Sequence, residues 1–98
     1  MTIERLLDIQ SPLIQAPMAG VQDSRLAIAV AEAGGLGAVP SAQMSPSHLV
    51  EEIAAFRRAT SAPLNVNFFC HVPPVPDAAR EAAWRARLEP YYLSLIHI

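Results

Sequence analysis

Three short apolar runs alternate with helix-length segments, and this alternation constrains the fold more than any other feature of the sequence. The runs cover residues 13–16, 36–40 and 64–69. The first two have the length and composition of a strand that is covered on both faces, and the third alternates apolar residues with asparagines. Because the connections between the runs are near helix length, the sequence predicts parallel strands joined by right-handed crossovers. We therefore expect an α/β fold of order βαβαβ, followed by a third helix.

The first two helices carry their own start and stop signals. Asp23 or Ser24 is expected to cap the first helix, since a side-chain oxygen there accepts a first-turn N–H. Gly34 is expected to end that helix in the left-handed conformation. Ser45 followed by Pro46 predicts the start of the second helix. On its polar face, Glu51 and Glu52 are expected to face solvent.

The third helix and the residues after it are less regular. Asp77 is expected to cap a helix from residue 78 to about residue 89, and Pro90 is expected to end or kink it. Residues 93–98 then change abruptly in character. One reading frame of a common sequencing-library transposon end encodes the same six residues. We expect residues 1–92 to be the natural segment and residues 93–98 to be a non-native tail, with a natural apolar strand as the alternative.

Composition excludes several classes of protein. The chain has 98 residues, 52% of them hydrophobic, which is enough for a core. Its net charge of −2 does not favour nucleic acid or an anionic membrane as a partner. A single cysteine, Cys70, suits a reducing compartment, and no signal peptide or membrane-length apolar run is visible. We expect a cytoplasmic protein with no metal site.

The end of the first apolar run is the best candidate for a binding site. Pro17 ends the strand, because it has no N–H to donate. Ala19 and Gly20 leave no bulk there, so a flat ligand can approach the backbone. Ligands of α/β folds bind at this end of the strands. In the third run, Asn65 and Asn67 share one face, and Leu64, Val66 and Phe68 share the other. In a barrel the asparagines would point inward, toward the ligand end, whereas in a lone sheet they would face water.

Three stretches of the sequence together resemble one enzyme family. They are Ile14-Gln15-Ala16-Pro17-Met18-Ala19-Gly20, Ala33-Gly34-Gly35-Leu36-Gly37 and Asn65-Val66-Asn67-Phe68-Phe69. In this order and at these separations they resemble the first strand-end motifs of nitronate monooxygenases, FMN enzymes built on a TIM barrel. The resemblance implies a partial TIM barrel of three βα units. It also implies that the FMN contacts Ala16, Pro17, Met18, Ala19 and Asn67.

The activity implied by this resemblance is the oxidation of alkyl nitronates with O2. The family's catalytic base is a histidine further along the chain, so no catalytic residue is assigned here. His48 is expected to be exposed, and His71 is expected to be a loop residue, with a position in the substrate pocket as the alternative. Cys70 has no visible base partner, which gives little support to a nucleophilic role. The glycines at residues 34–37 follow a helix and precede a strand, which is the wrong context for a phosphate-binding loop.

Two alternatives stay open. The first is a flavin-dependent enoyl-ACP reductase, a near relative of the family. The second is a small non-catalytic α/β module that binds a partner through its open sheet edge or through Trp84, Leu88 and Tyr91. The isolated chain is expected to be inactive, and its oligomeric state is left open.

Overall fold

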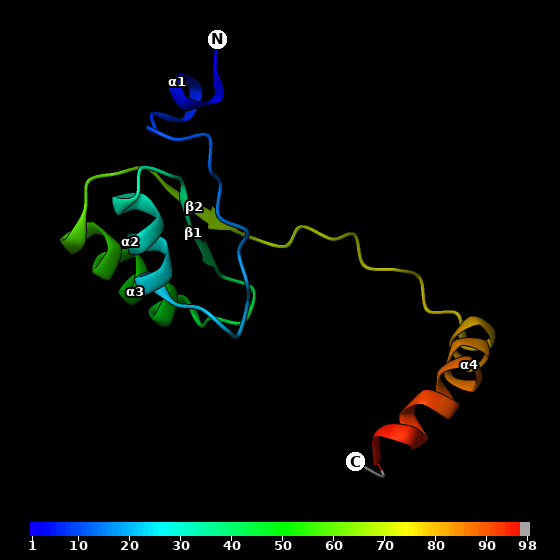
Figure 1. Cartoon of the computed structure of the whole chain (residues 1–98). Helices are drawn as coiled ribbons and strands as arrows, with labels where there is room; N and C mark the ends of the chain where they lie inside the picture. Colours follow the sequence, from blue (N-terminus) through cyan, green and yellow to red (C-terminus); the bar gives the residue numbers. More distant parts are fainter. Residues whose placement is uncertain (97–98) are drawn as a thin grey trace.

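A computed structural model describes residues 1–96 of the chain (Figure 1). Its elements run in the order α1 (Ile3–Leu7), α2 (Ser24–Glu32), β1 (Gly37–Pro40), α3 (Pro46–Ala59), β2 (Leu64–Asn67) and α4 (Ala78–Ile96). The predicted α/β class is confirmed, with strands and helices alternating from α2 to α4.

The two strands pair in parallel, as predicted. Gly37 lies opposite Leu64 and Pro40 opposite Asn67, so both strands end at the same edge. The Ser41 N–H closes the ladder by donating to the Asn67 carbonyl at 3.1 Å, and the Ser41 hydroxyl donates to the same oxygen. Strand β2 therefore ends two residues before its predicted end. Phe68, the next residue, is 60% exposed.

The prediction of a first strand over residues 13–16 is wrong, because the pairing there is much shorter than predicted. Only one parallel bridge forms there, between Ile14 and Leu36. The Leu36 N–H donates to the Leu13 carbonyl at 2.8 Å, and the Gln15 N–H donates to the Leu36 carbonyl at 3.0 Å. The backbone pairing stops at this point, because Pro17 has no N–H for the next ladder bond.

The predicted helix signals are confirmed for α2 and α3. Asp23 is the N-cap of α2, and its side chain accepts the Arg25 N–H at 2.8 Å. Gly34 follows the end of α2 with φ of 89°. Ser45 is the N-cap of α3, with Pro46 as the first helical residue.

The core lies between β1 and these two helices. Ala27 of α2, Val39 of β1 and Phe56 of α3 are each 0% exposed and pack together, with Leu64 against them. A Cβ on Gly37 would lie 2.3 Å from the Ala27 carbonyl oxygen, so α2 contacts the strand through its backbone. Since paired residues in parallel strands share a face, Leu64 and Val66 lie on the same face of the sheet as Val39, toward the helices.

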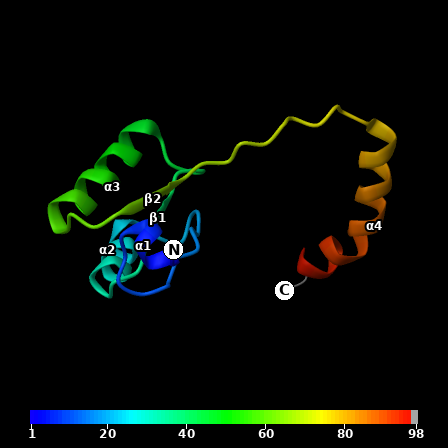
Figure 2. The same ribbon diagram turned by 90° about the horizontal axis from the view of Figure 1, so that it is seen from above.

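Helix α4 lies apart from this α/β unit (Figures 1 and 2). The radius of gyration is 19.0 Å, whereas a compact chain of this length has about 13 Å. The predicted end near residue 89 is wrong, because α4 continues through Pro90 to Ile96. Its ribbon changes direction in the last turns (Figure 2). Residues 93–96 are thus helical, and His97 and Ile98 lie outside the described residues.

Candidate functional site

The residues predicted to bind a ligand lie at one edge of the strands. Residues 16–19 follow the bridge at Ile14, and Asn67 ends β2. Strand β1 lies between them, and neighbouring strands are about 4.8 Å apart, so the two groups are separated by roughly 10 Å. The structure thus places all five predicted residues along one carboxyl-terminal edge.

Two glutamine side chains extend the pairing of β1 beyond the bridge. Gln15 Oε1 accepts the Ala38 N–H at 2.9 Å, and Gln22 Nε2 donates to the Ala38 carbonyl at 2.8 Å. In a regular parallel ladder the backbone of residues 15 and 17 would make these two bonds. Because Pro17 has no N–H, Gln22 supplies the missing donor from the loop.

Gln22 also holds the turn that follows Pro17. Its Oε1 accepts the Met18 N–H at 2.9 Å and the Gln15 Nε2–H at 2.9 Å. The Val21 N–H donates to the Met18 carbonyl at 3.4 Å, and Gly20 has φ of 79°. That φ suits the third position of a type II turn, which favours glycine. The turn is therefore tied both to itself and to β1.

The turn is also bounded on its other side. A Cβ on Gly20 would lie 2.7 Å from Oε1 of Gln43, which belongs to the loop between β1 and α3. Any side chain at residue 20 would be strained by the positive φ and would have to displace this glutamine. Glycine at this position keeps the two loops of the edge close together.

Few hydrogen-bonding groups remain available to a ligand at this edge. Pro17 has no N–H, and the Met18 N–H is bonded to Gln22. Within residues 1–96, no hydrogen bond reaches the Ala16 N–H, the Ala19 N–H or the Asn67 side-chain amide. A floor of small side chains with two N–H donors and one amide suits the polar edge of a flat heteroaromatic ring. The residues present therefore fit a flavin.

A partly buried carboxylate fixes the helix that leaves this site. Glu52 of α3 accepts the Ser24 N–H at 2.6 Å and lies 3.3 Å from His48 Nε2. Burial alone would raise the pKa of Glu52, but hydrogen bonds from Ser24 and His48 outweigh it and lower the pKa. The expectation that Glu52 faces solvent was wrong, because its side chain is only 16% exposed. It is drawn inward by the unpaired N–H of the first turn of α2.

The other candidate residues lie away from the edge, on exposed chain. Cys70 is exposed, and His71 is exposed with its ring 5.2 Å from that of Phe69. Among the residues that the structure describes, no group of three His, Cys, Asp or Glu side chains could hold a metal ion. None of the helices described is both long and apolar enough to cross a membrane.

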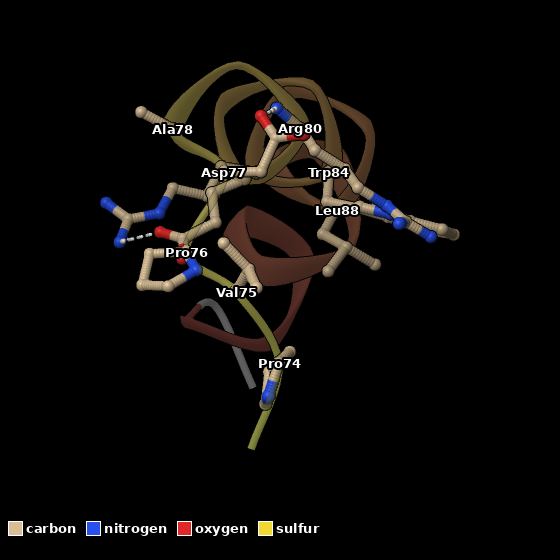
Figure 3. Close-up of a pocket in the computed structure, with 10 residues that line it drawn as sticks. Pro74, Val75, Pro76, Asp77, Ala78, Arg80, Trp84 and Leu88 are labelled. Atoms are coloured by element: carbon tan, nitrogen blue, oxygen red, sulfur yellow. Dashed lines mark hydrogen bonds and ion pairs between the residues drawn. The ribbon is translucent and has the colours of Figure 1, made fainter. Parts of the chain in front are cut away.

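A separate groove lies on α4 (Figure 3). Pro74, Val75 and Pro76 of the preceding loop line it together with Trp84 and Leu88 of the helix. In Figure 3 the side chains of Trp84 and Leu88 lie on the same side of the helix as Val75. The groove shares no residue with the strand edge, so it is not part of the candidate flavin site.

Comparison with known proteins identifies the family. The family model described as nitronate monooxygenase matches residues 2–96. The chain belongs to the nitronate monooxygenase family. A nitronate monooxygenase of Pseudomonas aeruginosa is 48% identical over 91 residues, and one of Paraburkholderia phytofirmans is 45% identical over 87 residues. These matches cover 90% and 89% of this chain but 25% and 24% of the relatives, so the chain spans about a quarter of their length.

Two solved structures resemble the chain in fold. FabK from Thermotoga maritima has a TM-score of 0.67 at 38% identity, over 72% of this chain and 23% of its own. Nitroalkane oxidase from Streptomyces ansochromogenes has a TM-score of 0.66 at 36% identity, over 86% of this chain and 24% of its own. The predicted family is confirmed.

Sequence reasoning missed the parts played by Gln15, Gln22 and Ser41. Nothing in the sequence around Gln22 distinguishes it from an ordinary loop residue. The signal was nevertheless present: a proline in a strand leaves the carbonyl of its neighbour without a donor, and buried carbonyls are almost always paired. Which side chain supplies the donor to Ala38 depends on the path of the folded chain.

Proposed function

We propose that this chain is the N-terminal part of an FMN-dependent oxidoreductase that oxidises alkyl nitronates with O2. The observation that carries the proposal is the strand edge, where small residues lie beside free hydrogen-bonding groups. The chain's membership of the family supports the same function. We further propose that the edge belongs to a (β/α)8 barrel, of which this chain supplies the first three βα units. Such a barrel needs about 250 residues, and the curated relatives, of which 91 residues are 25%, are long enough to contain one.

The proposed roles follow from which groups are available. The N–H groups of Ala16 and Ala19 would donate to the polar edge of the ring, and Pro17 and Met18 would form its floor. The Asn67 amide would donate or accept in the plane of the ring. When bound, FMN supplies the acceptor for the electrons of the substrate. No residue of this chain is proposed as the catalytic base, which the family resemblance places further along the sequence.

A second candidate is a flavin-dependent enoyl-ACP reductase. It is kept because FabK and nitroalkane oxidase resemble the chain almost equally in fold. The identity to curated nitronate monooxygenases favours the first candidate. Oxygen consumption with an alkyl nitronate, compared with oxidation of a nicotinamide by an enoyl thioester, separates the two.

For the 98-residue chain itself we propose no activity. Strand β2 has one unpaired edge, and the helix that follows it is largely exposed, so a ring bound at Asn67 would have solvent on one side. We also propose a cytoplasmic location and a non-native tail at residues 93–98. Resequencing the source DNA across codon 92 tests the tail, because codons unlike the transposon end would contradict it.

The deciding experiment uses the longer protein encoded by the source gene. We expect it to purify with one FMN per chain and to consume O2 with alkyl nitronates. Asn67→Ala should weaken FMN binding by about tenfold, as expected for one buried amide hydrogen bond of about 1.5 kcal/mol. Asn65→Ala is the matched control, since Asn65 lies on the same face of β2 but two residues before the edge. A longer protein without flavin would overturn the proposal.

A further inference from the structure

We propose that Gln22, together with Gln15, is a positioning residue for the flavin. This inference rests on the proposed function and deepens it. The side-chain amide of Gln22 fixes the turn after Pro17, and it thereby decides which backbone groups of that turn remain available to the ring.

The argument begins with the partners of this one side chain. Gln22 bonds to Met18 in the turn, to Gln15 at the end of the bridge and to Ala38 in β1, at 2.9, 2.9 and 2.8 Å. These partners belong to two segments of the chain, residues 15–18 and strand β1. Gln15 is 8% exposed, and its Oε1 bonds in turn to the Ala38 N–H. The two amides therefore form a closed network between the turn and the sheet.

The chemistry of the network is specific to an amide. Gln22 must accept two hydrogen bonds at Oε1 and donate one at Nε2, which only an uncharged amide of this length does. A carboxylate would place a negative oxygen against the Ala38 carbonyl. An apolar side chain would leave the Ala38 carbonyl and the Met18 N–H without these hydrogen bonds. The side chain that replaces the missing Pro17 N–H is thus restricted in both length and polarity.

The hydrogen bonds of Gln22 determine which backbone N–H groups the flavin can contact. With the Met18 N–H bonded to Gln22, the donors left on residues 16–20 are the N–H groups of Ala16, Ala19 and Gly20. Removing the Gln22 amide frees the Met18 N–H and releases the turn from β1. We expect the flavin then to bind more weakly and in an altered electrostatic environment, which changes its spectrum and its reduction potential as well as its affinity.

The first test is Gln22→Met in the longer flavoprotein, a change that keeps the length of the side chain and removes its amide. We expect FMN to dissociate about tenfold more readily or worse, with a shifted flavin absorbance and reduction potential. Gln10→Met is the matched control, because Gln10 is exposed and lies beside Gly34 at the opposite end of the strands. The control should keep the affinity, spectrum and potential of the wild-type protein.

The second test uses Gln22→Glu and the pH dependence of flavin affinity. A protonated carboxyl can still donate to the Ala38 carbonyl and accept from Met18, whereas the ionised form cannot donate. The new carboxyl changes from the first form to the second as the pH rises through its pKa. Affinity should therefore be near that of the wild type at low pH and should fall as the pH rises through this pKa. Wild type and Gln22→Met should show no such step.

The outcomes separate this inference from the proposed function. A wild-type protein that binds no flavin overturns both. A wild-type flavoprotein whose Gln22→Met variant keeps its affinity, spectrum and potential overturns the positioning role alone. If Gln22→Met does not fold, Gln22→Glu decides: a pH-dependent affinity supports the role, and a pH profile like that of the wild type contradicts it.

Discussion

The α/β unit at residues 10–67 and the segment at residues 68–96 differ in what their helices contact. Helix α3 buries Phe56 completely against β1 and α2, whereas in the longer helix α4 Trp84 and Leu88 are each 52% exposed. Both helices have apolar residues at helical spacing. The comparison teaches that such a pattern specifies a helix and its contact face, but not the surface that covers this face.

The connections explain why only the first unit is packed. Helices α2 and α3 each connect two segments that pair side by side. Because both ends of each helix are held at the sheet, the helix packs against it. The segment before α4 contains Pro73, Pro74 and Pro76 and leads away from β2 as an extended chain (Figure 1). In the barrel that we propose, a following strand would pair with β2 and bring α4 back to the same layer.

The largest expected effect comes from removing the core side chain of α3. Phe56→Ala should lower the free energy of unfolding of the α/β unit by about 3–5 kcal/mol, because a fully buried aromatic ring leaves a cavity. Urea denaturation of the 98-residue chain, followed by circular dichroism, measures this change. Leu88→Ala in α4 is the matched control and should change the free energy of unfolding by no more than about 0.5 kcal/mol. Equal losses for both variants would break the comparison between the two regions.

A smaller effect is expected where α3 contacts the start of α2. Glu52→Gln should lower the free energy of unfolding by about 1 kcal/mol near neutral pH, since a carboxylate at a helix N-terminus is favourable. Because the pKa of Glu52 is lowered on folding, this stabilisation is present above the unfolded pKa and is lost as the pH falls through the folded pKa. Denaturation at a series of pH values should show wild type and variant converging in acid.

Glu51→Gln provides the control for this pH series. Glu51 lies beside Glu52 on α3 but is exposed. Its replacement should leave the pH dependence of stability close to that of the wild type. A Glu51 variant that lost as much as the Glu52 variant would show that net charge, rather than the contact with Ser24, is responsible.

The smallest effect on the α/β unit is expected from a change within α4. Pro90→Ala should strengthen this helix locally by up to about 3 kcal/mol, because proline inside a helix removes a hydrogen bond and clashes with the preceding turn. Helical circular dichroism should rise, while hydrogen exchange at Val39 and Phe56 stays unchanged. Slower exchange at these core amides would show that α4 contacts the α/β unit in solution.

Local signals predicted most of the α/β unit. Asp23, Ser45 and Pro46 marked the helix starts, and the parity of β2 placed Leu64 toward the helices. The first strand was overestimated, because an apolar run predicts a strand without showing whether its backbone donors reach a partner. The end of α4 was also missed, since Pro90 lowers helix propensity without abolishing the helix.

The candidate site was predicted in part. Motif resemblance selected residues 16–19 and Asn67, and parallel pairing placed them at one edge. The bonds from Gln15 and Gln22 to Ala38 join residues 23 and 16 positions apart. Contacts at such separations depend on the path of the folded chain, and no local pattern in the sequence shows them.

The hydrogen bond from Gln22 to Ala38 fixes the number of residues in the loop between Met18 and Gln22. Inserting one residue between Met18 and Gln22 would displace the side-chain amide by up to about 3.5 Å, more than a bond of 2.8 Å tolerates. Exchanging Val21, which is 79% exposed, would leave the amide where it is. Substitutions are therefore tolerated at the tip of this loop, whereas insertions and deletions within it are not.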